Sequence, residues 1–474
     1  MDKYKKLAAD TLIFAVGSFG SKILMLLLTR LYTHNIASGD NSTKSLLEQT
    51  ATFLIPIATL SIADAILRYG LDRDYDNKEV FTSACTVEAC GLLLMILLSP
   101  LLNFLPYTDG YVILLVLYIM ASAFRQLSSQ FVRARNMLKL FALDGILATL
   151  SLFIFNVIFI SVLQMGVLGF MLSAILSDFC SGVFLWIVAK LWQFLGRKYF
   201  NVEVIKTMLR FSVPMIPTAI LWTITEFSDR LFVRYMTSAH SPDVGEVAAG
   251  VYDAASKVPH LISMVSTIFF QAWNMSAITA SQSKDKSEFY AKIFSAYQSI
   301  IFLGAAFMIA LVKPLCAILI DSSTDPSYAR AFEFTPILII GVLTMTLNQF
   351  LSSIYTATKK TTHSFWTSLV AAGSNLILNT ILIYQWGVQG ATIATFLSYF
   401  LCYLVRIVDT RKLIYFEVDH LHFACNLLVL FVMSVGSITE PFFLIPMQVG
   451  FLLFMTLFNF SDIMQTVQKL LKRG

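Results

Sequence analysis

The sequence predicts an all-α, polytopic membrane protein with about fourteen transmembrane helices. Of the 474 residues, 57% are hydrophobic and only 13% are charged, and 40 are Phe. A soluble domain carries about 25% charged residues. Apolar segments of about 20 residues, the length that crosses a bilayer, recur from end to end and are separated by short polar loops.

Hydropathy windows place the expected helices along the chain. They cover residues 11–33, 46–70, 80–105, 111–132, 141–164, 166–192, 211–236, 246–272, 290–320, 331–357, 362–385, 388–408, 420–438 and 441–460. The most basic and polar break follows the sixth segment. We therefore expect two six-helix bundles related by a pseudo-twofold repeat, over residues 1–200 and 201–412, and two additional helices with a short tail over 413–474.

The basic residues predict the orientation, because loops on the cytoplasmic side are rich in Lys and Arg. One side receives most of them: Lys3, Lys5, Lys6, Arg73, Lys78, Arg133, Arg135, Lys139, Lys190, Arg197, Lys198, Lys206, Arg210, Lys284, Lys286, Lys292, Lys359, Lys360, Arg406, Arg411, Lys412, Lys469, Lys472 and Arg473. The other side receives only Lys44, Lys313, Arg234 and Arg330. Both termini are therefore expected in the cytoplasm, with an uncleaved first span in the inner membrane.

Loop length and motif content argue against several classes of protein. The longest outer loop, His34 to Leu46, is polar and short, so no soluble catalytic domain is expected. The net charge of +5 is spread over many loops, which argues against a nucleic-acid partner. The six cysteines form no CxxC, and no phosphate-binding or HExxH motif occurs. We expect no enzyme activity, no cofactor and no metal site.

One apolar stretch carries features that a lipid-facing helix does not use. Residues 211–236 contain Pro214 and Pro217 as well as Glu226, Asp229 and Arg230. A charge at bilayer depth costs about 2.5–3.5 kcal/mol on insertion scales. A bent helix beside a polar cavity uses both proline and charge. We interpret this helix as the wall of a transport pathway, with Pro214, Pro217 and, in the next segment, Pro259 as hinges.

Other charges inside apolar segments extend this interpretation. Three acid–base pairs are four residues apart, which suits contact on one helix face: Asp64 and Arg68, Glu226 and Arg230, Asp253 and Lys257. Each pair either neutralises itself or anchors its helix at the headgroups. Asp144 and Asp178 are interpreted as helix-interface charges. Lys22 lies too deep to reach the surface and has no acid one turn away.

The alternative to self-neutralisation is a cation-rich vestibule between the two halves that attracts an anionic head group. Its candidate residues are Lys22, Arg30, Arg68, Arg230 and Lys257. The nearby acids either limit repulsion in the empty state or carry a coupling proton or sodium ion, and the sequence does not choose between these roles. The ion-coupling candidates are Asp64, Glu226, Asp229 and Asp253.

Three stretches, 55–72, 212–233 and 252–278, resemble the bacterial polysaccharide-biosynthesis flippases of the multidrug/oligosaccharidyl-lipid/polysaccharide exporter superfamily. The P-x-x-P pattern followed by Ser-Asp-Arg, from Pro214 to Arg230, is moderately specific to this group. The resemblance covers the chain to about residue 410, and the last two helices match the fourteen-helix layout of lipid II flippases. The outer loop 34–45 departs from the short acidic-Tyr-Gly turn that is common in the family.

The resemblance implies a V-shaped pair of bundles that exposes a central cavity alternately to each side. The cargo would be an oligosaccharide on undecaprenyl diphosphate, carried by a monomer with its lipid tail in the bilayer. Carried over from the family, Arg30, Arg68 and Arg230 would contact the head group. The resemblance does not give the sugar composition, the polysaccharide pathway or the role of the last two helices.

Two other functions remain open from the sequence. A cation-coupled multidrug or metabolite antiporter of the same superfamily would need an acid-lined cavity. A membrane polysaccharide polymerase or ligase would need a large outer loop bearing catalytic Arg or His, and no such loop is expected here.

Overall fold

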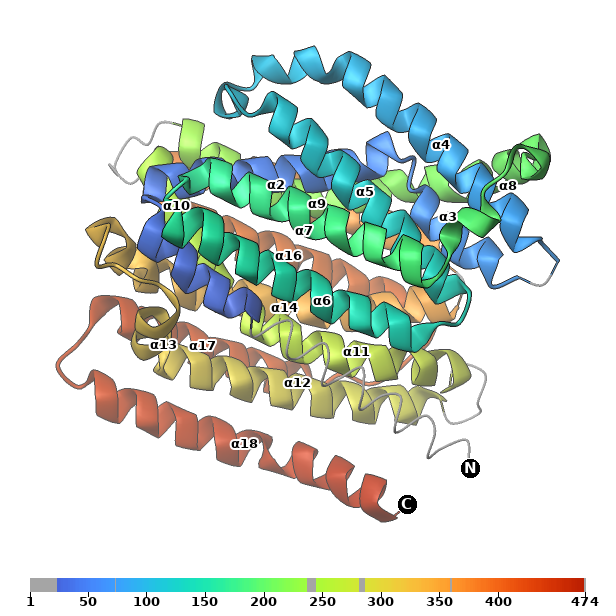
Figure 1. Ribbon diagram of the computed structural model, residues 1–474. Coiled ribbons are helices and arrows are strands. Elements are labelled where there is room, and N and C mark those ends of the chain that lie inside the picture. Colours follow the sequence, from blue (N-terminus) through green and yellow to red (C-terminus); the bar gives the residue numbers. More distant parts are fainter. Residues whose placement is uncertain (1–23, 73, 237–243, 281–285, 359, 473–474) are drawn as a thin grey trace. The chain divides into compact units, whose positions relative to one another are not determined.

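The computed structural model describes residues 24–72, 74–236, 244–280, 286–358 and 360–472. Within these ranges every regular element is a helix and no strand occurs (Figure 1). The chain divides into two compact units, Met1–Phe227 and Ser228–Gly474. The prediction of an all-α, polytopic fold is confirmed. The predicted limits at residues 200 and 412, and the internal repeat, stay predictions.

The N-terminal unit is built from a helical segment over residues 24–35 and eight further α-helices, the last shared with the next unit. These are α2 (Ser38–Ala58), α3 (Ile62–Gly70), α4 (Asn77–Leu98), α5 (Val112–Ala134), α6 (Leu138–Asn156), α7 (Gly166–Val188), α8 (Val202–Ser212) and α9 (Ile216–Tyr235). Short helical turns join them: η1 (Ser99–Phe104), η2 (Pro106–Thr108), η3 (Val157–Val162), η4 (Leu191–Phe194), η5 (Arg197–Tyr199) and η6 (Val213–Met215). Inside this unit α5 packs on α7, and α6 on α7.

The C-terminal unit begins within α9 and continues through nine more α-helices. These are α10 (Glu246–Lys257), α11 (His260–Ala280), α12 (Lys286–Ala310), α13 (Val312–Leu319), α14 (Ala331–Ala357), α15 (Thr361–Trp386), α16 (Val388–Thr410), α17 (His420–Thr439) and α18 (Leu444–Lys472), with the turn η7 (Pro326–Arg330) before α14. Helix α14 is the most enclosed, and it packs against α11, α16 and α17. Its Phe350 stacks on Trp273 of α11 at 4.7 Å between ring centroids.

The described ranges contain ten helical runs long and apolar enough to cross a membrane, or eleven if α2 and α3 form one span bent by 56°. The predicted count of fourteen is not confirmed. Most of the first predicted segment, 11–33, lies outside the described residues. The segment 246–272 divides into α10 and α11, and Leu444–Phe460 is a shorter apolar helix.

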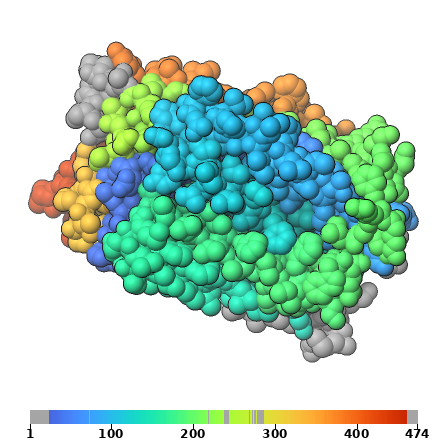
Figure 2. Space-filling model, turned by 45° about the horizontal axis from the view of Figure 1, so that its top comes forward, coloured from blue at the N-terminus to red at the C-terminus, as the bar shows by residue number. Residues whose placement is uncertain are grey.

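Large apolar side chains cover the outer surface of several of these helices, as expected for helices that face lipid. On α4, α5 and the turn between them, Leu97, Phe104 and Ile113 are among the most exposed residues. In Figure 2, α4 and α5 belong to the blue to teal part of the space-filling surface.

The predicted outer loop from His34 to Leu46 is wrong, because α2 begins at Ser38 and only Ile36 and Ala37 separate it from the preceding helix. Its polar residues turn into the N-terminal unit rather than toward water. Lys44 is 1% exposed, and its ammonium lies 4.3 Å from the Tyr32 ring centroid and 3.9 Å from Glu48. A cation over an aromatic face, with a carboxylate nearby, offsets part of the cost of burial.

Helix breaks coincide with two of the three predicted hinge prolines. Pro214 lies in the turn η6 between α8 and α9, and Pro259 lies between α10 and α11. Proline has no N–H to donate to the carbonyl four residues earlier. The carbonyl freed by Pro259 is that of Ala255, and it accepts the Thr335 hydroxyl from α14. Pro217 sits in the first turn of α9, where a missing N–H is tolerated. Hinge motion at these residues stays a prediction.

Candidate functional site

The candidate site lies in the C-terminal unit, where α9, α10, α15 and α16 bring buried polar side chains together. Helix α15 packs against α16, and both present small polar residues to Asp229 at the start of the unit. Two adjacent residues of α9, Asp229 and Arg230, meet two adjacent residues of α10, Tyr252 and Asp253. Neighbouring side chains diverge by about 100° around a helix, so the two contacts point in different directions.

Asp229 is fully enclosed by neutral donors. Its Oδ1 accepts the side-chain amides of Asn375 at 3.0 Å and Asn379 at 2.7 Å. Its Oδ2 accepts the Tyr252 hydroxyl at 2.8 Å and the Thr395 hydroxyl at 2.6 Å. These four hydrogen bonds offset part of the cost of burying a carboxyl group that is only 2% exposed.

An acceptor remains without a donor beside this carboxylate. The Oδ1 atom of Asn379 is buried and has no hydrogen-bond partner among the described residues, although its amide nitrogen donates to both Asp229 and Asn375. Native proteins rarely leave a buried acceptor unpaired, and a bound ion or water is one explanation. Carboxylate, amide and hydroxyl oxygens are the ligands that hard cations prefer.

The second part of the site is a carboxylate shared by two cations. Asp253 is 1% exposed, and its Oδ1 accepts both Nε and Nη2 of Arg230 at 3.0 Å. The same oxygen lies 3.4 Å from the Lys257 ammonium. Arg230 is 4% exposed, whereas Lys257 is 25% exposed. Arg230 is therefore enclosed by protein, and Lys257 carries the accessible charge.

The predicted pair of Asp253 and Lys257 is present, but Arg230 is held across two helices. Its described partners Asp253 and Ser256 both come from α10. Glu226, the predicted partner of Arg230, lies one turn earlier on α9 and within the N-terminal unit. Spacing along one helix could not show the contact with Asp253, because it depends on how α10 packs.

The structure places the remaining predicted cations in other surroundings. Lys22 lies outside the described residues. Arg30 is an exposed residue of the helix over 24–35. The predicted pair of Asp64 and Arg68 is wrong: Arg68 is 58% exposed and contacts Asp72, at 3.4 Å. Since α3 ends at Gly70, Arg68 reaches past the helix end toward the polar turn that follows.

A second, partly buried charge cluster lies inside the N-terminal unit. Arg125 of α5 contacts Asp144 of α6 at 3.6 Å and Asp178 of α7 at 3.2 Å. Ser181 accepts Arg125 Nε at 2.9 Å and donates to Asp144, and Ser122 donates to Asp178. The residues come from three helices, so this cluster was not visible in any single segment of the sequence.

Sequence reasoning also missed Arg406, which it placed among the loop residues that set the orientation. Arg406 is fully buried within α16. It donates to the Asn348 carbonyl at 2.7 Å, and to the hydroxyls of Thr367 and Ser368 at 2.9 and 3.0 Å. Arg406 lies four residues before the end of α16, and this position inside the helix was the signal that it is not a loop residue. Arg406 joins α14, α15 and α16.

A chain of membrane-length helices that buries fixed charges in this way is a multi-pass membrane protein. Comparison with known families refines this class: residues 7–274 match the model of the polysaccharide biosynthesis protein family. This match covers more than half of the chain, so the chain belongs to that family. The predicted family resemblance is confirmed. No curated protein matches the sequence.

Solved structures of low sequence identity share the fold. The lipid II flippase MurJ in an inward closed conformation is 15% identical over 96% of this chain and 99% of that chain, with a TM-score of 0.73. An inward-facing multidrug resistance MATE family transporter of the MOP superfamily is 15% identical over 84% and 98%, with a TM-score of 0.64. The Vibrio cholerae MATE transporter VcmN is 13% identical over 88% and 98%, with a TM-score of 0.60.

Proposed function

We propose that this protein is a flippase that moves an oligosaccharide linked to undecaprenyl diphosphate across the cytoplasmic membrane. It works by alternating access, without covalent chemistry, and both its termini lie in the cytoplasm. Membership of the polysaccharide biosynthesis protein family supports the class of cargo. The fold shared with MurJ and MATE transporters supports the mode of action, since those proteins are flippases and transporters.

The observation that carries the head-group part of the proposal is the unequal exposure of two cations on one carboxylate. Arg230 is held by Asp253 in the protein interior, whereas Lys257 shares that carboxylate and keeps a quarter of its side chain accessible. A diphosphate that approaches Lys257 competes with a single ion pair of 3.4 Å. We therefore assign first contact with the diphosphate to Lys257, and to Arg230 the positioning of Asp253.

We assign ion coupling to Asp229. Its four donors and the unpaired oxygen of Asn379 form a compact set of oxygen and amide groups without a fixed positive partner in the described contacts. Rotation of the Asn375 or Asn379 amide would turn an oxygen toward a bound sodium ion. Asp229 would accept a proton without such a rotation. The roles of Asp64 and Glu226 as further ion-coupling residues stay predictions.

The experiment that tests the function uses purified protein in proteoliposomes. A fluorescent undecaprenyl-diphosphate oligosaccharide is placed in one leaflet, and its appearance in the other is followed by quenching with an impermeant reductant. We expect flipping above that of empty liposomes, and stimulation by an imposed sodium or proton gradient. Failure to flip any diphosphate-linked oligosaccharide, with the protein folded by its melting transition, would reject the proposal.

A cation-coupled antiporter is the second candidate function. The likeness to MATE transporters favours it, as does the N-terminal cluster in which two carboxylates surround one Arg125. Efflux of a cationic dye from the same vesicles separates the two functions. Gradient-driven dye efflux without lipid flipping would favour the antiporter.

A further inference from the structure

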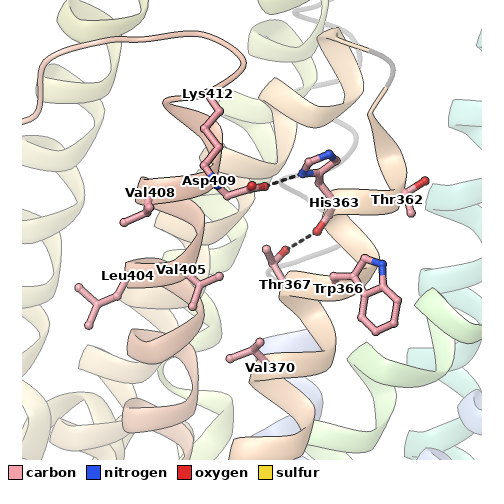
Figure 3. Close-up of a pocket in the computed structure, with 10 residues that line it drawn as sticks. All are labelled: Thr362, His363, Trp366, Thr367, Val370, Leu404, Val405, Val408, Asp409 and Lys412. Atoms are coloured by element: carbon pink, nitrogen blue, oxygen red, sulfur yellow. Dashed lines mark hydrogen bonds and ion pairs between the residues drawn. The ribbon is translucent and has the colours of Figure 1, made fainter.

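A groove opens between one end of α15 and one end of α16, away from the site described above. Its volume is about 770 Å³, within the range of about 300–1,000 Å³ that small-molecule sites occupy. In Figure 3 the polar side chains of His363, Asp409 and Lys412 gather at one end of the groove. The apolar side chains of Leu404 and Val370 lie farther along the two helices.

The polar end presents the Lys412 ammonium, while the Asp409 carboxylate is turned toward other donors. Asp409 is already engaged, because it pairs with Nδ1 of His363 at 2.8 Å and accepts the Tyr355 hydroxyl at 2.9 Å. The Lys412 ammonium has no ion-pair partner in the described part of the chain. Helix α15 begins at the same end, and its N-cap residue Lys360 makes no capping hydrogen bond with its side chain among the described residues. The positive end of its dipole adds to the attraction for an anion.

The apolar flank of the groove faces outward. Trp366 is 60% exposed and Val408 is 61% exposed, and both lie on helices that meet the criteria for membrane spans. Leu404 and Val405 continue the same surface along α16. Tryptophan is enriched where the hydrocarbon region meets the headgroups. The groove therefore has a charged end at headgroup depth and an apolar side at hydrocarbon depth.

We propose that this groove binds one anionic glycerophospholipid. The phosphate is held by Lys412 and the first turn of α15, and an acyl chain lies along Val370, Leu404 and Val405. Charge complementarity and the exposed apolar flank select a lipid, since a soluble anion would have no use for the flank. The basic residues at this end predict that it faces the cytoplasm, so the lipid comes from the cytoplasmic leaflet.

The bound lipid has a structural consequence for the Asp229 cluster. Helices α15 and α16 form one hairpin, and this hairpin supplies Asn375, Asn379 and Thr395 to Asp229. A lipid that contacts both helices at their other shared end restrains the hairpin as a unit. The inference does not depend on the proposed cargo, because it concerns only lipid and hairpin.

Native mass spectrometry of the full-length protein tests this inference, with equal amounts of phosphatidylglycerol and phosphatidylcholine in the detergent solution. We expect phosphatidylglycerol to be retained about fivefold more, as one lysine at a membrane surface provides. Lys412→Gln should remove this preference, whereas Lys206→Gln, an exposed lysine on α8, should leave it unchanged. Val405→Trp should lower retention of both lipids by filling the groove, and Ile377→Trp, at a lipid-facing position outside the groove, should not.

Several outcomes would overturn the inference. Equal retention of the two lipids by the native protein would show that the groove does not recognise the anionic headgroup. If lipid retention were unchanged in either Lys412→Gln or Val405→Trp, the groove would be excluded as the lipid-binding site. The melting transition must show that each variant is folded. Displacement of the lipid by inorganic phosphate alone, or stronger retention of undecaprenyl diphosphate, would assign the groove to a different ligand.

Discussion

At the scale of single residues, Asp253 binds two cations, Arg230 and Lys257, in different ways. The carboxylate is buried and accepts two hydrogen bonds from Arg230, while Lys257 approaches it from a more exposed position. Loss of Arg230 would leave Asp253 with weaker compensation in the protein interior. Loss of Lys257 would leave the buried pair intact. Substitution of Arg230 is therefore expected to lower stability, whereas substitution of Lys257 is expected to lower transport.

We expect Arg230→Ala to destabilise the protein by about 3–5 kcal/mol, because removing one partner leaves a buried charge uncompensated. Lys257→Gln should change stability by about 1 kcal/mol or less, as for other partly exposed pairs. It should lower flipping about tenfold, since one charge-assisted hydrogen bond to a diphosphate contributes about 1.5–3 kcal/mol. Melting transitions and proteoliposome flipping measure the two effects.

The control for Lys257 is Lys292→Gln, which removes a more exposed lysine that also pairs with an acid one turn away. This variant should flip lipid at the native rate. If Lys257→Gln flipped lipid at the native rate, the assignment of Lys257 to the head-group site would be rejected. A fully stable Arg230→Ala would show that Asp253 does not depend on Arg230.

Asp229 gives a second prediction at this scale. Asp229→Asn keeps the shape of the side chain but removes its charge, so the site can no longer accept a proton or balance a sodium ion. We expect flipping in a sodium or proton gradient to fall to the level seen without a gradient. Asp321→Asn, in a loop of the same unit, is the matched control. Gradient stimulation that survives Asp229→Asn would assign coupling to other residues.

At the scale of elements, the hairpin of α15 and α16 connects most of the features described in the C-terminal unit. It supplies three donors to Asp229, it encloses Arg406, and it forms the lipid groove. The two helices approach closely at their turn. A Cβ atom on Gly390 would lie 2.0 Å from the Leu382 carbonyl oxygen, which no side chain can occupy without a shift of the backbone.

Gly390→Ala should therefore destabilise the protein by about 1–3 kcal/mol, the usual effect of overpacking. Gly373→Ala, within α15, is the matched control, because a Cβ there meets no atom within 4 Å. That control should be neutral or slightly stabilising, since Ala favours helix over Gly. Melting transitions of the two variants measure this difference in stability. Equal stability of both would show that the turn of the hairpin relaxes easily.

At the scale of the whole molecule, the positive-inside pattern predicts where each loop lies. A green fluorescent protein fused after Lys412 or after the last residue should fluoresce, because both positions are predicted to be cytoplasmic. A fusion after Thr439, between α17 and α18, should not fluoresce, whereas alkaline phosphatase there should be active. An active phosphatase at the C-terminus would mean that the number of spans is odd.

The sequence alone determined the class of protein and most of the helices. Segments such as 331–357 and 388–408 agree with α14 and α16 to within a few residues, because a bilayer demands long apolar runs. Proline chemistry also located the breaks near Pro214 and Pro259. The polar stretch 34–46 was misread as a loop, because hydropathy cannot distinguish residues that face water from residues that face a polar protein interior.

Tertiary packing decided which charges meet. Spacing along one helix identified the contact of Asp253 with Lys257, but it could not identify those of Arg230 with Asp253, of Asp229 with two asparagines, or of Arg125 with two aspartates. These partners come from different helices, and a one-dimensional pattern contains only neighbours within a turn or two. The sequence determined that buried charges need partners, because isolated charges are costly in an apolar medium, and only the packing of the helices decided the partners.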